Sequence, residues 1–225
     1  MPRVCVFDVN ETLLDLKALD PHFERIFGDA AVRQEWFGQM IQSALVSTVT
    51  GAYSDFGSIG GAALQMTAER HSIELSEEDR QSILTTVPQL PPHPEVREAL
   101  DRLRDAGLRL VTLTNSTQQV ADNQMENSGL GEYFEQMLSA DTVQRLKPAP
   151  EPYHLAAEKL GVEIGEIRLV AAHAWDTAGA SRVGCATAFV RRPGKVPDPL
   201  VETPDVIGDD LLEVADGIIA AEVQG

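Results

Sequence analysis

Four short runs of apolar residues recur along the chain, separated by longer amphipathic segments. The runs cover residues 4–7, 108–113, 168–172 and 186–190. Unbroken apolar runs of this length are typical of parallel strands that are covered on both faces. Segments 94–106 and 151–160 place apolar side chains at helical spacing, and a glycine follows each segment as a helix stop. This alternation predicts a doubly wound, Rossmann-like α/β core built on a parallel sheet.

The stretch from residue 16 to residue 90 interrupts this alternation after the first predicted strand. It contains several helical patterns and no convincing strand; the broadest apolar stripe runs over 31–48 at three- and four-residue spacing. A proline-rich link at 87–94 closes the segment. We therefore predict an all-helical cap domain at 16–90, inserted into a core domain that consists of 1–15 and 91–225.

The chain is strongly acidic, with 35 acidic and 18 basic residues and a formal net charge of −17. This balance argues against non-specific binding to nucleic acid or to anionic membranes. No stretch approaches the roughly 20 apolar residues of a membrane span, and the first residues lack a signal-peptide pattern. We expect a cytoplasmic protein whose partner is a small anionic substrate. Cys5 and Cys185 show no CxxC spacing and are expected to be buried free thiols.

Polar residues that could take part in catalysis follow the predicted strands. They are Asp8 and Thr12 after the first, Thr114 and Asn115 after the second, Lys147 in the LKPAPEPY stretch, and Asp176 after the third. In an open parallel sheet, ligands bind beyond the carboxyl ends of the strands. A carboxylate is a nucleophile when it is ionised and held, and a lysine nearby favours that form. Asp8 is therefore the candidate nucleophile, with hydroxyl and amide groups available as hydrogen-bond donors.

This order of motifs, with a helical insertion after the first, resembles the haloacid dehalogenase (HAD) superfamily. Three details are most similar to its type II (L-2-haloacid) dehalogenases: Asn10 two residues after Asp8, KPxPxxY at 147–153, and AWD at 174–176. The resemblance implies an (S)-2-haloacid dehalogenase activity, in which halide leaves a small 2-haloalkanoate and an Asp8 ester is hydrolysed to a 2-hydroxy acid. It also suggests a homodimer.

Asn10 occupies the position where superfamily phosphatases carry a second aspartate. That aspartate protonates a departing alkoxide, which an amide cannot do. Halide is a weak base and leaves without a proton, so Asn10 favours dehalogenation. The scheme needs no metal or other cofactor, because Lys147 can supply the positive charge. A hydrolase of phosphate or another small substrate, and a catalytically silent anion-binding member, remain open alternatives.

The resemblance also implies roles for further residues. Asn115 and Trp175 would cradle the halide, Asp176 would hold Lys147 and orient or activate water, and Tyr153 would line the site.

The cap departs from the family pattern. Type II dehalogenases carry an arginine after a tryptophan on a cap helix, whereas here Phe37 follows Trp36 and Gln39 is a nearby neutral polar residue. His173 is either a hydrogen-bonded structural group or a general base. The candidate substrate-binding residues are Asn10, Phe37, Gln39, Tyr153, His173 and Trp175.

Overall fold

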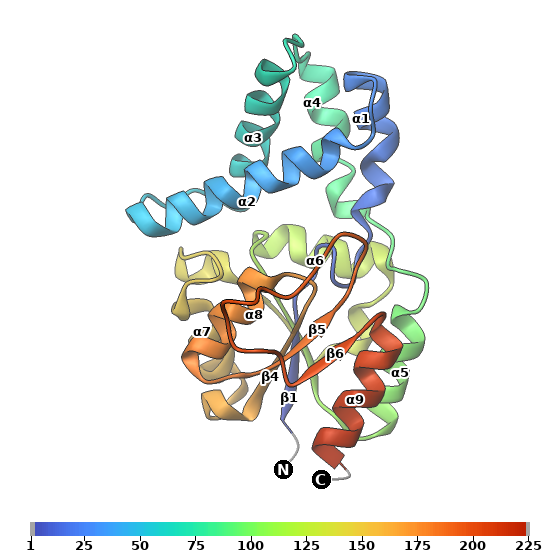
Figure 1. Cartoon of the computed structure of the whole chain (residues 1–225), viewed down its shortest axis with the longest axis vertical. Coiled ribbons are helices and arrows are strands. Elements are labelled where there is room, and N and C mark those ends of the chain that lie inside the picture. The colour runs from blue at the N-terminus through green and yellow to red at the C-terminus, as the bar shows by residue number, and fades with distance from the viewer. Residues whose placement is uncertain (1–2, 224–225) are drawn as a thin grey trace.

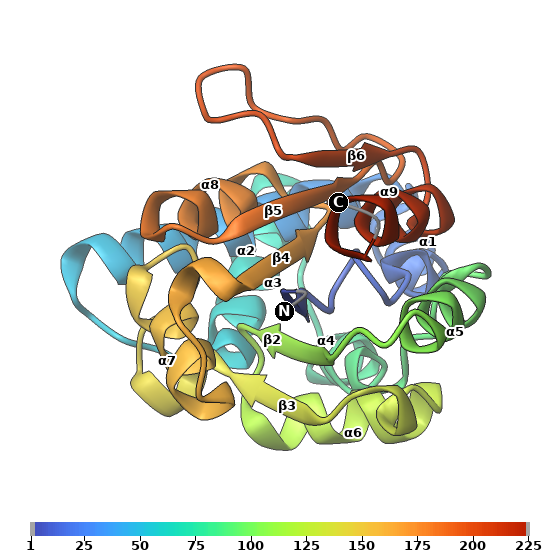
Figure 2. The same cartoon turned by 90° about the horizontal axis from the view of Figure 1, so that it is seen from below.

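A computed structural model describes residues 3–223 and contains one sheet of six parallel strands in the order β3-β2-β1-β4-β5-β6. The strands are β1 (Val4–Phe7), β2 (Leu110–Thr114), β3 (Gln136–Ser139), β4 (Ile167–Ala171), β5 (Ala186–Val190) and β6 (Val206–Gly208). The chain moves outward from β1 through β2 to β3 and then returns to β4 on the other side of β1 (Figure 2). The predicted doubly wound α/β core is confirmed.

Helices cover both faces of this sheet (Figure 2). The core helices are α5 (Val96–Asp105), α6 (Gln118–Ser128), α7 (Pro150–Leu160), α8 (Ala174–Val183) and α9 (Leu211–Val223). Successive side chains of a strand point to opposite faces. Phe7 of β1 accordingly packs with residues of α5 and α9, and Val6 packs with residues of α7 and α8. Burial on both faces explains the unbroken apolar runs in the sequence.

Two of the six strands, β3 and β6, were not predicted. β3 is an edge strand with the sequence QMLS, and its first two residues are partly exposed. β6 is the opposite edge and has only three residues. An edge strand is covered on fewer sides, so it does not need an unbroken apolar run.

The inserted helices lie beyond the carboxyl edge of the sheet (Figure 1). They are α1 (Asp20–Phe27), α2 (Val32–Thr50), α3 (Phe56–Arg70) and α4 (Glu77–Leu84). Trp36 of α2 donates a hydrogen bond from Nε1 to the carbonyl of Gly60 in α3 at 2.9 Å. A Cβ at Gly60 would lie 3.1 Å from Met40 Cε, so the absence of a side chain there allows α2 and α3 to pack closely. The domain boundaries stay a prediction.

The chain leaves and re-enters the core through two segments that pair with each other. Asp15 N donates to the carbonyl of Pro91 at 2.8 Å, and Leu14 forms an antiparallel bridge with Pro92. Short 3-10 helices occupy Leu16–Leu19, Val87–Gln89, Gly131–Tyr133, Ala140–Val143 and Ile164–Glu166. None of the helices in residues 3–223 is both long and apolar enough to cross a membrane.

The two cysteines are buried free thiols, as predicted. Burial raises the pKa of Cys5 and of Cys185 to about 12. A thiol with so high a pKa stays protonated at neutral pH and is a poor nucleophile.

Candidate active site

Asp8 follows β1 directly and leaves the sheet at the point where the strand order reverses. Its backbone N–H donates to the carbonyl of Val170 in β4 at 3.0 Å. Thr12 Oγ1 donates to Asp8 Oδ2 at 2.7 Å and accepts from Ala172 N at 2.9 Å. Asp8 is 5% exposed, and its carboxylate is thus fixed between β1 and β4, where open α/β sheets bind ligands.

Lys147 joins two carboxylates in the buried interior. Its Nζ lies 3.0 Å from Asp8 Oδ1, 2.5 Å from Asp176 Oδ2 and 2.8 Å from the carbonyl oxygen of Leu113. Tyr153 donates from its hydroxyl to Asp176 Oδ1 at 2.6 Å. An ammonium has three N–H donors, and these contacts use all three. Four residues that the sequence predicted for the site therefore form one network.

The charged groups in this network shift one another's pKa values. Burial alone would raise the pKa of Asp8, but Lys147 and hydrogen bonds from His173 and Thr12 outweigh burial and hold that pKa below its usual range. Burial likewise opposes the charge of Lys147, but the two carboxylates keep its pKa above the ordinary value. Burial raises the pKa of Asp176, and Lys147 offsets this only in part. The ionised form is consequently favoured more strongly at Asp8 than at Asp176.

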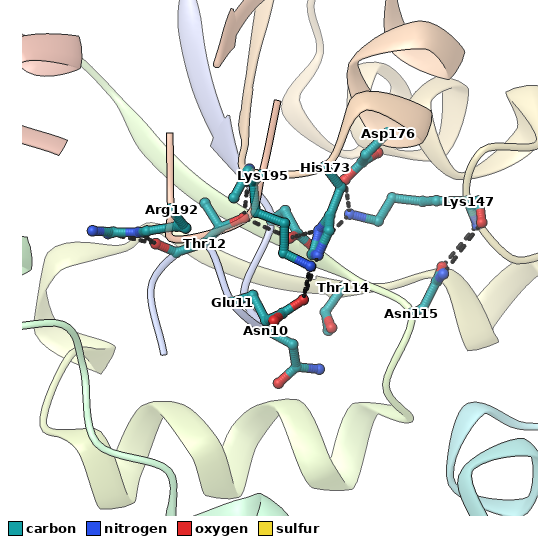
Figure 3. Close-up of polar contacts among 12 residues, drawn as sticks. Asn10, Glu11, Thr12, Thr114, Asn115, Lys147, His173, Asp176, Arg192 and Lys195 are labelled. Carbon is teal, nitrogen blue, oxygen red and sulfur yellow. Dashed lines mark hydrogen bonds and ion pairs between the residues drawn. The ribbon is translucent and has the colours of Figure 1, made fainter. Parts of the chain in front are cut away.

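Asn115 positions Lys147 through a two-point contact (Figure 3). Lys147 N donates to Asn115 Oδ1 at 2.7 Å, and Asn115 Nδ2 donates to the Lys147 carbonyl at 3.2 Å. Thr114 is buried, and its hydroxyl oxygen accepts from Ser116 N at 3.2 Å. Both residues shape the loops around Asp8 without a hydrogen bond to its carboxylate in the described residues. A part for Asn115 in holding halide stays a prediction.

Asn10 faces away from the ionic network. Its Nδ2 donates to Ser116 Oγ at 3.3 Å, and its Oδ1 accepts from Gln124 Nε2 at 2.9 Å. It also lines a cavity of about 160 Å³ between the core and the cap. The other lining residues include Trp36, Phe37, Met40 and Phe56 of the cap and Ser116 and Thr117 before α6. Asn10 thus belongs to the polar end of a mostly apolar pocket.

His173 contacts two carboxylates at once. Its Nδ1 lies 3.1 Å from Asp8 Oδ2, and its Nε2 lies 3.0 Å from Glu11 Oε2. Lys195 Nζ lies 2.6 Å from the same Glu11 oxygen. Burial would lower the pKa of His173, but the two carboxylates outweigh burial and raise it to about 9. His173 is therefore a cation at neutral pH.

Aromatic rings enclose His173. Phe37 of the cap stacks on one side with ring centroids 5.8 Å apart, and Trp175 stacks on the other at 5.1 Å. Phe37 and His173 also line a second cavity of about 410 Å³, together with Glu11, Trp175 and Lys195. The structure therefore brings Phe37, His173 and Trp175 to the site.

Gln39 is not part of this arrangement. Its Nε2 donates to Ser43 Oγ at 3.1 Å, and its carbonyl oxygen accepts from Arg70. It lines a separate surface cavity with Gln42, Met66 and these two partners. The placement of Gln39 among the substrate-binding residues is not supported by this geometry, because residues two apart on a helix, such as Phe37 and Gln39 on α2, point to different sides of it.

Three charged residues of the site were missed in the sequence. Glu11 lies inside the first motif, and its backbone has φ of +62°, an uncommon value for a residue other than glycine. Arg192 and Lys195 follow β5; Arg192 Nη2 donates to the Thr12 carbonyl at 2.8 Å. Their signal is the RRPGK stretch at 191–195, which follows the fourth predicted strand and lies at the same edge of the sheet as Asp8.

Metal ligands are not grouped in the part of the chain that the structure describes: no three His, Cys, Asp or Glu side chains there could jointly hold an ion. The positive charges beside Asp8 belong to Lys147 and His173. Independence from metal stays a prediction.

Fold and site together define a capped α/β enzyme with a buried carboxylate at the carboxyl edge of its sheet. The chain belongs to the haloacid dehalogenase-like hydrolases, because the model of that family matches residues 2–184. This confirms the resemblance found in the sequence.

Known proteins agree with this assignment. The (S)-2-haloacid dehalogenase 4A of Burkholderia cepacia is 28% identical over 198 residues, which are 87% of this chain and 86% of that protein. Haloacetate dehalogenase H-2 of Moraxella sp. (strain B) is 29% identical over 201 residues, 88% of this chain and 90% of that one. The solved structure of the L-2-haloacid dehalogenase from Xanthobacter autotrophicus has the same fold, with a TM-score of 0.91 at 24% identity over 100% of both chains.

Proposed function

We propose that this hydrolase displaces halide from a small 2-haloalkanoate through an Asp8 ester, which water then hydrolyses to a 2-hydroxy acid. The observation that carries the proposal is the buried contact of Asp8 Oδ1 with Lys147 Nζ at 3.0 Å. It favours an ionised, immobile carboxylate, which is what nucleophilic catalysis requires. The names of the relatives, a 2-haloacid and a haloacetate dehalogenase, support the substrate class.

We assign Oδ1 of Asp8 as the attacking oxygen. Oδ2 is in hydrogen-bond contact with Thr12 and His173, whereas Oδ1 contacts Lys147 alone among the described side chains. A carboxylate oxygen has two lone pairs, so Oδ1 keeps one for attack on C2 of the substrate. The C–O bond forms as the carbon–halogen bond breaks, and halide leaves with the bonding electrons.

The surroundings of Asn10 suit a leaving group that needs no proton. Both ends of its amide are engaged, by Ser116 and Gln124, and an amide has no proton to transfer at neutral pH. A departing alkoxide would need an acid at this position, whereas halide does not.

The cavity beside Asn10 supports a substrate with a carboxylate and an apolar chain. Its cap side is formed by aromatic and aliphatic residues, and its polar end lies at the start of α6, where helix N-terminal amides favour anions. Apolar cavities of about 150 Å³ hold benzene. With about 160 Å³, this pocket has room for chains longer than that of chloropropionate.

Asp176 fits a supporting role in the second step. It holds Lys147, and its raised pKa makes it a better proton acceptor than Asp8. We propose that it takes a proton from the attacking water and passes that proton to the departing oxygen of the hydroxy acid. No step of this scheme passes through a metal.

Halide release from L-2-chloropropionate and haloacetates, with and without EDTA, tests the proposal. Asp8→Asn is expected to lower turnover at least ~10⁴-fold, as loss of a covalent nucleophile does. Asp101→Asn, the same change at an exposed position of α5, keeps the wild-type rate, and EDTA has no effect. Halide release that survives in Asp8→Asn would sink the mechanism, and magnesium-dependent phosphate release would instead favour a phosphatase.

A further inference from the structure

We propose that Thr12 and His173 form an oxyanion hole for hydrolysis of the Asp8 ester, and that Glu11 positions His173 and keeps it positively charged. The proposal rests on the proposed ester and assigns a function to Glu11, which the first step does not use. Thr12 and His173 touch the reacting carboxyl group, whereas Glu11 acts through His173.

The distances to Asp8 Oδ2 carry the proposal. If Oδ1 forms the ester, Oδ2 is the carbonyl oxygen and takes the negative charge when water attacks Cγ. Thr12 Oγ1 lies 2.7 Å and His173 Nδ1 lies 3.1 Å from Oδ2. Donors at 2.7–3.1 Å from the oxygen that will carry the charge are the geometric criterion for an oxyanion hole. Both donors are in place before the reaction, so none has to reorganise.

Four residues hold the imidazole ring of His173, and Asp8 is one of them. Its second nitrogen faces Glu11 Oε2 at 3.0 Å, and its two ring faces stack on Phe37 and Trp175. Glu11 is itself held by its ion pair with Lys195. Its backbone is in the left-handed conformation, which turns Glu11 toward the ring. A non-glycine residue in that conformation persists where the surroundings enforce it, commonly at functional sites.

The charged groups around His173 explain why it remains a cation in the ester. Asp8 and Glu11 contact the ring directly. Behind them lie Lys147, which pairs with Asp8, and Lys195 and Arg33, which face Glu11 at 2.6 and 3.9 Å. Ester formation removes the charge of Asp8, but the carboxylate of Glu11 stays. The pKa of His173, raised to about 9 in the free protein, therefore falls only in part.

The step conserves atoms and charge. Water attacks Cγ of Asp8, and the carbonyl electron pair moves onto Oδ2, where Thr12 and His173 stabilise it. As the C=O bond re-forms, the bond from Cγ to the alkyl-bearing oxygen breaks and that oxygen leaves with the hydroxy acid. One water proton reaches this oxygen through Asp176, and the other dissociates to solvent as the Asp8 carboxylate is regenerated.

A measurement on the resting protein tests the charge of His173 without any substrate. Asp8→Asn replaces the carboxylate by a neutral group of the same shape and so mimics the ester. Nitrogen-15 NMR of the histidine ring at pH 7.5 is expected to show both ring nitrogens protonated in wild type and in Asp8→Asn, and loss of one proton in Asp8→Asn/Glu11→Gln. A neutral ring in Asp8→Asn alone would overturn the proposal, because a neutral His173 is the state that a general base needs.

Rapid-quench kinetics with bromoacetate and L-2-chloropropionate test the step itself. His173→Phe keeps an aromatic ring between Phe37 and Trp175 but removes both N–H donors of the imidazole. It is expected to release about one halide per protein in a burst, to accumulate a mass-shifted Asp8 peptide, and to hydrolyse the ester 10²- to 10³-fold more slowly. His154→Asn, a change at an exposed histidine of α7, should leave both steps unchanged. A wild-type rate of ester hydrolysis in His173→Phe would contradict the proposal.

The pH profile of ester hydrolysis separates a donor from a base and from a structural residue. A cationic donor loses activity as pH rises through its pKa, whereas a base gains it. Glu11→Gln should move this loss of activity to lower pH, because a carboxylate that stabilises the cation is gone. Glu11→Asp should restore the wild-type position of this alkaline limb in part. Glu158→Gln on the surface of α7 should leave the limb in place. An unmoved limb, or hydrolysis that rises with pH in wild type, would overturn the proposal.

Absence of halide release by wild type would refute the dehalogenase proposal, and the NMR measurement still decides the charge of His173.

Discussion

At the carboxyl edge of the sheet the core presents ionised side chains, whereas the cap helices beyond it present mostly apolar ones. Lys147 and His173 of the core lie at hydrogen-bond distance from Asp8, and Asp176 pairs with the same Lys147 ammonium. The cap contributes Trp36, Phe37, Met40 and Phe56 to the neighbouring cavity. The core therefore supplies most of the charge, and the cap supplies an apolar wall.

This division has a physical reason. Charges in a buried site must be paired and hydrogen-bonded, and strand ends anchored in a sheet can hold such pairs to fractions of an ångström. Cap helices need only bury apolar side chains against one another and against the pocket. Substitutions in the core are therefore expected to affect both stability and turnover, and those in the cap mainly the choice of substrate.

The largest effect is expected from Lys147→Met, which leaves Asp8 and Asp176 without their shared partner. Removal of one member of a buried ion pair typically costs 3–5 kcal/mol, so the free energy of unfolding in urea should fall by about that amount. Turnover should fall at least about 10³-fold, because the pKa of Asp8 loses the group that holds it low.

A double substitution separates the two effects. Lys147→Met/Asp176→Asn removes one positive and one negative charge and leaves the net buried charge unchanged. It should recover most of the lost stability without recovering halide release. Equal recovery of both would show that Lys147 acts only as a structural counter-ion.

A smaller effect concerns the stability contributed by His173. Its pKa rises from 6.5 to about 9 on folding, so its stabilisation is complete below about pH 6.5 and is lost as pH rises through 9. The shift corresponds to about 3 kcal/mol. Urea unfolding at pH 6.5 and pH 9 should show that loss in wild type and much less of it in His173→Phe. The same loss in both proteins would assign the pH dependence to other groups.

The sequence predicted the parts of the fold that are buried on both sides. The runs that became β1, β2, β4 and β5 are apolar because helices cover both faces of the sheet. β3 and β6 lie at the edges, are short, and gave no such signal.

The candidate site divides in the same way. Asp8, Thr12, Lys147, Tyr153 and Asp176 were predicted because they follow strands or belong to a motif, and the structure joins them in one hydrogen-bonded network. The pairing of Glu11 with His173 could not be predicted, because it depends on a left-handed residue in a loop and on a stack with a cap helix. Spacing along the chain carries no information on either.

The smallest expected effects compare two positions on one cap helix. Phe37 lines both cavities and stacks on His173, whereas Gln39 faces Arg70 at a separate cavity. Phe37→Arg places a cation beside the pocket and removes part of its apolar wall. It should lower the KM for chloroacetate about fivefold, in line with one added ion pair of about 1 kcal/mol, and raise the KM for 2-haloacids with longer chains. Gln39→Arg should change neither KM more than about twofold, because surface substitutions away from a site have small effects. Equal responses at the two positions would mean that the cap does not select substrates through the face that carries Phe37.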